Sequence, residues 1–140
     1  MLVGRYRIPQ PRNALAMAVR EFAHAAMDVS DGLAGDLAKL CAASGVSAVI
    51  DAQSIPLSAA AATLRARGAI GIEALVSGGD DYEILCAIPD DHVDVYAQAA
   101  RVAGVSVTSI GTIVAGTSMP RLLDAQGDTI ILPRLSYSHF

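Results

Sequence analysis

The 140-residue sequence has few aromatic residues and almost no cysteine. It contains no tryptophan, two phenylalanines, four tyrosines and two cysteines. Because alanine, a small helix former, supplies much of the hydrophobic fraction, we expect closely packed helices on a sheet and not an aromatic-rich core. Cys41 and Cys86 lie in apolar runs without C-x-x-C spacing, so we interpret them as reduced core residues, as in a cytoplasmic protein.

Long apolar runs and basic runs are absent as well. No apolar run approaches the ~18 residues of a membrane span, and the N-terminus lacks the pattern of a signal peptide. The net charge is −4 and no basic run exceeds two residues, which disfavours binding to nucleic-acid phosphates. The sequence therefore predicts a cytoplasmic protein without nucleic-acid or membrane partners. A phosphorylated ligand would need Mg²⁺, helix N-termini or basic groups from another polypeptide.

Two common catalytic patterns are missing too. The sequence has no serine elbow and no G-x-G-x-x-G, so it offers no support for acyl transfer or dinucleotide binding. His24, His92 and His139 have no metal-binding spacing, and we expect His24 and His92 at the surface or at helix ends.

The elements that are present form one domain. Residues 1–12 contain Pro9 and Pro11 and are interpreted as an interdomain connector, which leaves 13–140 as the domain. Periodicity and turn signals predict helices beginning near residues 13, 33, 58, 70 and 91, and strands near 26–28, 46–51, 82–88, 105–114, 121–124 and 129–132. We expect N-caps at Asn13, at Ser58 and at Asp90 or Asp91, a helix C-terminus at Gly45 and a bulge at Gly111. This order predicts an α+β fold, a two-layer sandwich of a mixed sheet with helices on one face.

The first functional motif joins a strand to a helix. Asp28 ends the apolar strand, Ser30 and Asp31 offer oxygens where the helix begins, and Gly32 permits close backbone approach. Asp28 and Asp31 are suited to hold Mg²⁺ against a phosphate at the helix N-terminus. A capped helix with surface acids is the simpler interpretation of this motif taken alone. Asp36, one turn further, is expected either on the helix surface or as a residue that supports the metal ligands without binding the metal itself.

The second motif is a glycine-rich acidic loop. Gly78 and Gly79 precede Asp80, Asp81 and Glu83, which lead directly into an apolar strand. Placing three acidic side chains beside a buried strand costs folding free energy unless they face water, a metal or a cationic ligand. A solvated loop would explain any one acid, but the whole segment favours a ligand.

Together the motifs resemble the C-terminal domain of thiamine-monophosphate kinase, in the superfamily of aminoimidazole ribonucleotide synthetase and selenophosphate synthetase. The matching stretches occur in family order over nearly the whole chain: 27–33, 36–37, 44–45, 55–58, 78–85, 110–111 and 137–140. The resemblance implies a domain of the same fold and a kinase that transfers the γ-phosphoryl group of ATP to thiamine monophosphate, giving thiamine diphosphate with the help of Mg²⁺.

The resemblance also implies roles for single residues. Asp28 and Asp31 are expected to bind Mg²⁺, and Ser30 to contact an ATP phosphate. Asp80 and Phe140 are expected to contact the substrate; the family usually has Glu at the position of Asp80. No residue is expected to act as a nucleophile, because a phosphate oxygen of the substrate attacks.

Only the C-terminal half of the family enzyme is matched. The N-terminal domain supplies most other nucleotide and metal ligands and forms the homodimer in this superfamily, so the isolated domain is expected to be inactive. Two alternatives are another ATPase of the superfamily, such as a hydrogenase-maturation or selenophosphate type, and a stand-alone domain that binds a phosphorylated ligand without catalysis.

Overall fold

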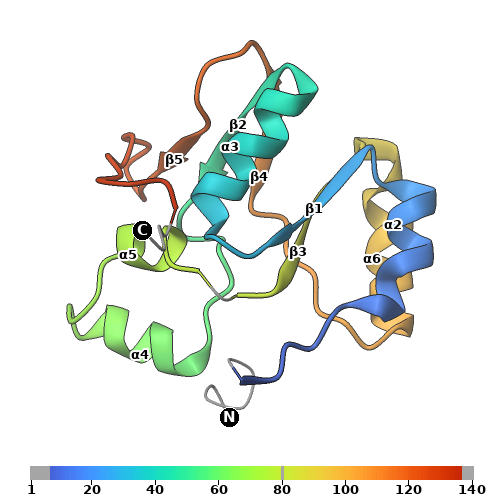
Figure 1. Ribbon diagram of the computed structural model, residues 1–140, viewed down its shortest axis with the longest axis horizontal. Coiled ribbons are helices and arrows are strands. Elements are labelled where there is room, and N and C mark those ends of the chain that lie inside the picture. The colour runs from blue at the N-terminus through green and yellow to red at the C-terminus, as the bar shows by residue number, and fades with distance from the viewer. Residues whose placement is uncertain (1–6, 80, 137–140) are drawn as a thin grey trace.

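The computed structural model of the chain describes residues 7–79 and 81–136. These described residues form five strands in two sheets, with helices between and around them (Figure 1). Strand β1 (Ala25–Val29) pairs antiparallel with β3 (Glu83–Ala87). Strand β2 (Val46–Asp51) lies between β4 (Gly111–Ala115), which is antiparallel to it, and β5 (Arg121–Leu123), which is parallel. The predicted α+β class with a mixed sheet is confirmed.

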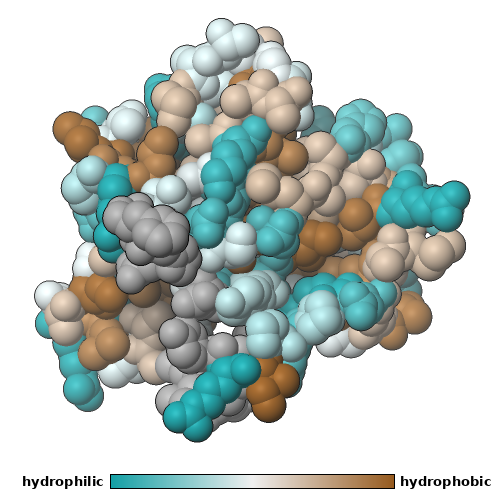
Figure 2. Space-filling model, viewed as in Figure 1, coloured by the Kyte–Doolittle hydropathy of each residue, from teal (hydrophilic) through white to brown (hydrophobic). Residues whose placement is uncertain are grey.

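Helix α3 (Leu33–Ser44) links the two sheets, because it packs against both β1 and β2. Its buried stripe joins β2, β5 and helix α5 (Ile72–Val76) in one apolar core: Leu37, Cys41, Ala48, Ile50, Ala52, Ile72, Val76 and Leu122. In Figure 2 a hydrophilic strip crosses the middle of the visible face over α3, with hydrophobic residues to its right over β1 and β3.

The remaining helices lie at the two sides of the molecule. The short helix η1 (Asn13–Leu15) continues into α2 (Ala16–Phe22), which packs against α6 (Val93–Val102) (Figure 1). Helix η2 (Asp90–His92) leads into α6, and α4 (Ala59–Ala66) lies beside α5 on the opposite side. In the described part of the chain, no helix is long and apolar enough to cross a membrane.

Two of the predicted helix ends are confirmed. The Ser58 hydroxyl accepts a hydrogen bond from the Ala61 N–H at 3.2 Å, and Gly45 ends α3 with a φ of 65°. The other predicted N-caps are wrong. Asn13 is the first residue of η1, and η2 follows Pro89, whose fixed φ starts the turn without a side-chain cap.

The C-terminal strands are shorter than predicted. Because β2 ends at Asp51, its antiparallel pairing with β4 reaches back only to Gly111, and 105–110 form no strand. Gly111 is no bulge: it pairs regularly with Ile50, and a Cβ there would lie 2.2 Å from the Val49 carbonyl oxygen. The predicted pairing of 129–132 with 121–124 is reduced to one bridge, Leu123 to Thr129.

Candidate functional site

The turn between β1 and α3 carries the first motif. Along β1 the side chains alternate, so Val29 is buried while Asp28 is exposed. Ser30 and Asp31 form the turn, and Gly32 precedes the first residue of α3. Asp28 near the end of β1 and Ser30 and Asp31 in the turn thus come within a few residues before the N-terminus of this helix, where the helix dipole favours negative charge.

Asp36 fixes this turn from inside the fold. It is only 1% exposed, and its Oδ2 accepts hydrogen bonds from the backbone N–H groups of Ser30 at 2.9 Å and Asp31 at 3.0 Å. The prediction of a helix-surface position was therefore wrong, although a position behind the proposed ligands agrees with the structure. Since these two N–H groups are bonded to Asp36, they are not the donors that would receive a phosphate.

Lys39 completes the network one turn further along α3. Its Nζ donates to Asp36 Oδ1 and to Asp31 Oδ2, each at 2.9 Å. The hydrogen bonds to Asp36 and Asp31 raise the pKa of Lys39, which keeps it protonated. Burial alone would raise the pKa of Asp36, but the hydrogen bonds from Lys39 and from the turn outweigh burial and lower it.

The structure brings the two motifs together at Gly32. This residue has a φ of 115°, and a Cβ on it would lie 2.8 Å from the Gly78 carbonyl oxygen and 3.1 Å from that of Val76. The loop after α5 is therefore packed directly against the β1–α3 turn. A second contact lies close by, where the Tyr82 N–H donates to the Val29 carbonyl at 2.9 Å. Glycine is required at position 32 for both its conformation and its space.

The acids of the second motif have different surroundings. Glu83 begins β3 opposite Val29 and receives two hydrogen bonds from Arg12, from Nε at 2.8 Å and from an Nη atom at 2.5 Å. The hydrogen bond to Glu83 is the main cause that raises the pKa of Arg12. Asp81 is exposed, whereas Asp80 lies outside the described residues. The ion pair between Arg12 and Glu83 connects the segment before α2 to β3, the strand that follows the glycine-rich loop.

The end of the chain also approaches α3. A Cβ on Gly35 would lie 2.6 Å from Ser136 Cβ and 3.1 Å from the Leu135 carbonyl oxygen. The segment that precedes the predicted aromatic tail thus crosses the first turn of α3 beside the motif. Phe140, the residue predicted to contact substrate, lies outside the described residues.

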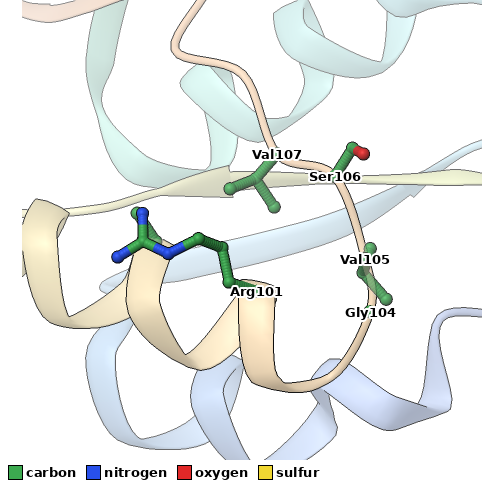
Figure 3. Close-up of a pocket in the computed structure, with 6 residues that line it drawn as sticks. Arg101, Gly104, Val105, Ser106 and Val107 are labelled. Atoms are coloured by element: carbon green, nitrogen blue, oxygen red, sulfur yellow. The ribbon is translucent and has the colours of Figure 1, made fainter.

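The described residues line two cavities, one beside α3 and one at the end of α6. One, of about 300 Å³, lies between α3 and the C-terminal segment and is lined mainly by apolar side chains, among them Leu33, Met119 and Leu135. The other, of about 400 Å³, lies at the end of α6, where Arg101 and Ser106 border it and Val107 lies between them (Figure 3). The lining of this second cavity includes none of the motif residues.

The metal-binding capacity of the described residues is limited. Within 7–79 and 81–136, no three or more His, Cys, Asp or Glu side chains are grouped so that they could hold a metal ion. Mg²⁺ in phosphoryl-transfer sites is bound by one or two carboxylates together with substrate phosphates. Asp28 and Asp31 fit that use, but not an all-protein metal cage.

Comparison with known proteins identifies the family. A family model described as AIR synthase related protein, C-terminal domain, matches residues 9–120. The chain belongs to this AIR synthase related family. Its predicted kinship with thiamine-monophosphate kinase is also confirmed, since curated relatives and solved structures carry that name.

Three relatives show how much of a longer protein this chain matches. Thiamine-monophosphate kinase of Caulobacter vibrioides is 38% identical over 141 residues, which cover 99% of this chain and 40% of the relative. The crystal structure of thiamine-monophosphate kinase from Stenotrophomonas maltophilia K279a is 37% identical, with a TM-score of 0.75, and is matched over 87% of this chain and 37% of that one. The structure of AaThiL complexed with AMPPCP and TMP is 26% identical, with a TM-score of 0.78, and the match covers 99% of this chain and 41% of that chain. This chain therefore spans about two fifths of the length of these relatives.

Sequence reasoning missed Lys39 as the partner of Asp31, and for Asp36 it left open whether the side chain lies on the helix surface or supports the ligands. A signal for them existed. An acid in the first turn of a helix often reaches back to N–H groups that precede it, and a lysine three residues later lies on the same face. The ion pair of Arg12 had no comparable signal, because it joins positions 71 residues apart.

Proposed function

We propose that this chain is the C-terminal part of a thiamine-phosphate kinase, which phosphorylates thiamine monophosphate with ATP to give thiamine diphosphate. The observation that carries the proposal is the contact of Gly32 with the Gly78 backbone, which joins the two motifs typical of these kinases into one site. Relatives named thiamine-monophosphate kinase, and the AaThiL complex with AMPPCP and TMP, support the choice of substrates.

In this proposal Asp28 and Asp31 hold Mg²⁺, and Ser30 contacts a phosphate of ATP. The exposure of Asp28 and the partial exposure of Asp31 support these roles, because a carboxylate must reach the ligand to neutralise it. When bound, Mg²⁺ supplies positive charge against the phosphates. The chain's own contribution is to hold two carboxylates and the Ser30 hydroxyl on a rigid turn, and phosphoryl transfer depends mainly on such positioning and charge neutralisation.

The substrate is proposed to lie against the glycine-rich loop. Asp80 would face the cationic thiazolium ring and Phe140 would stack on a ring of the substrate. Leu135 and Ser136 support the second role, because they bring the chain to the first turn of α3 just before the tail.

We further propose the domain division given above, with 1–12 as connector and 13–140 as the C-terminal domain. The partner would be the N-terminal domain of the same enzyme, in a homodimer, and 13–140 alone would be inactive. A cytoplasmic location is part of the proposal and is supported by the free thiols of Cys41 and Cys86.

The test is ATP-dependent formation of thiamine diphosphate by the native protein purified from its source, compared with its Asp28→Asn variant. We expect turnover that needs thiamine monophosphate and Mg²⁺ and that falls at least about a hundredfold in the variant, while the unfolding midpoint stays unchanged. Full activity in Asp28→Asn would refute the metal role. Binding of thiamine monophosphate without turnover would favour a non-catalytic binding domain, and ATP hydrolysis without it would favour another ATPase of the superfamily.

A further inference from the structure

Arg12 is held to the fold through both its side chain and its backbone. Its Nε donates to Glu83 Oε2 at 2.8 Å and an Nη atom donates to Glu83 Oε1 at 2.5 Å, so both carboxylate oxygens are used. Its carbonyl oxygen accepts from the Leu15 N–H at 2.8 Å, and Leu15 is only 1% exposed. Residues 7–11 are exposed, whereas Arg12 is half-buried. In the described part of the connector, Arg12 is therefore the point at which the chain is fastened to the domain.

The place of this attachment is next to both motifs. Glu83 is the first residue of β3 and is paired with Val29, the last residue of β1. The glycine-rich loop ends where β3 begins, and the turn with the first motif begins where β1 ends. A connector that is held at Glu83 is therefore held beside the proposed ligand site.

We propose that the Arg12–Glu83 pair is an anchor that sets how the part of the enzyme preceding residue 13 is oriented toward the glycine-rich loop. Arg12 and Glu83 are positioning residues in this inference, because they act through the connector and not by contact with substrate. The inference rests on the proposed function, in which the N-terminal domain supplies the remaining ligands. Since this chain spans about two fifths of the length of its relatives, the connector has a large partner to orient.

The geometry of the pair suits it to orientation more than to stability. An exposed ion pair contributes little to stability, but two hydrogen bonds from a planar guanidinium fix direction as well as distance. The two side chains are 25% and 40% exposed, so neither is fully hydrated. Pro9 and Pro11 stiffen the chain just before the anchor, because each proline fixes its own φ and restricts the residue before it. Fixing Arg12 therefore also restricts the direction in which the chain leaves the domain.

The first experiment needs no ligand and measures backbone order in the 140-residue chain by ¹⁵N NMR relaxation. The order parameter of the Gln10 amide should be near that of rigid backbone, about 0.85, in the wild type, and below about 0.6 in Arg12→Met and in Glu83→Gln. Arg12→Lys should resemble Arg12→Met, because lysine keeps the charge but not the two-bond geometry.

Arg7→Met is the matched control for this measurement. Arg7 lies in the same segment, is exposed, and has no ion pair with the residues that the structure describes. The control removes the same charge as Arg12→Met and should leave the Gln10 order parameter unchanged.

The second experiment measures formation of thiamine diphosphate by the native protein purified from its source and by its variants. Arg12→Met and Glu83→Gln should each lower kcat about tenfold or more, because small displacements of reacting groups slow phosphoryl transfer strongly. The fall in kcat should exceed the change in either KM, and the urea midpoint should change little. The double variant should be no slower than either single variant, since both remove the same bond. Exchanging the charges, with Arg12→Glu and Glu83→Arg together, should recover part of kcat, and Arg7→Met should keep all of it.

Three results would overturn the inference. An unchanged Gln10 order parameter in Arg12→Met and Glu83→Gln would show that the pair does not hold the connector. A lowered order parameter with unchanged kcat would show that the anchor does not orient the site, and losses that multiply in the double variant would show that the two residues act separately. If the wild type forms no thiamine diphosphate, the proposed function is wrong, and the order parameter alone then decides whether Arg12 and Glu83 anchor the connector.

Discussion

Replacing Asp36 by alanine should destabilise the fold far more than replacing another aspartate that makes the same kind of turn. Asp36 is 1% exposed and accepts two backbone N–H bonds, while Asp51 is exposed and accepts from the Gln53 N–H at 2.8 Å and the Ser54 hydroxyl at 2.6 Å. Asp36→Ala also deletes the bond from Lys39 Nζ to Asp36 Oδ1, so the difference between the two substitutions measures the effect of burial together with the loss of this ion pair.

The magnitude for Asp36 follows from its bonds. A hydrogen bond to a charged group contributes about 1.5–3 kcal/mol, and donors left unpaired in a buried position cost more than donors that water can reach. Because Ser30 and Asp31 are partly exposed, their N–H groups regain some hydration, so we expect a loss of about 3 kcal/mol in the free energy of unfolding. With an m-value of about 2 kcal/mol/M, the urea midpoint should fall by about 1.5 M.

The assay is urea unfolding followed by circular dichroism, with wild type, Asp36→Ala, Asp36→Asn and Asp51→Ala compared at one pH. Asp51→Ala should leave the midpoint close to that of the wild type. Asp36→Asn keeps the shape of the side chain and one acceptor oxygen, so its urea midpoint should lie between those of the wild type and Asp36→Ala. Equal shifts in Asp36→Ala and Asp51→Ala would refute the argument that burial gives Asp36 its effect.

Two further substitutions test the contact between the motifs and the core. Gly32→Ala should lower stability by at least about 2 kcal/mol, because its Cβ would meet the Gly78 carbonyl and its φ is 115°; Gly45→Ala, with a φ of 65° and nothing within 4 Å, should cost about 1 kcal/mol in the same urea experiment. Similar losses in both would argue against close packing at Gly32. Leu37→Ala should cost about 2–5 kcal/mol in thermal unfolding because it leaves a cavity in the core, whereas Leu64→Ala at a 46% exposed position should cost little; a reversed order would contradict the assigned core.

Much of the fold could be predicted because its signals are local. The β-branched run of β2, the apolar stripe of α3 and the ends marked by Ser58 and Gly45 all reflect interactions between residues near in sequence. The shortened C-terminal strands could not be predicted, since the length of β4 depends on where β2 ends, about 60 residues away, and a strand has no independent stability without its partner.

The candidate site divides in the same way. Asp28, Ser30, Asp31 and the glycine-rich loop could be selected because each carries a chemical pattern in consecutive residues. Their contact at Gly32 depends on the antiparallel pairing of β1 with β3, which consecutive residues do not encode. The burial of Asp36 likewise depends on that packing, so a residue that resembled a surface acid supports the turn.

If the two motifs form one ligand site, ¹H–¹⁵N NMR of the chain titrated with thiamine monophosphate and Mg²⁺ should show chemical-shift changes in both segments, 30–33 and 78–81, with one shared Kd. Changes in only one segment, or changes centred on the cavity at Arg101 and Val107, would contradict it.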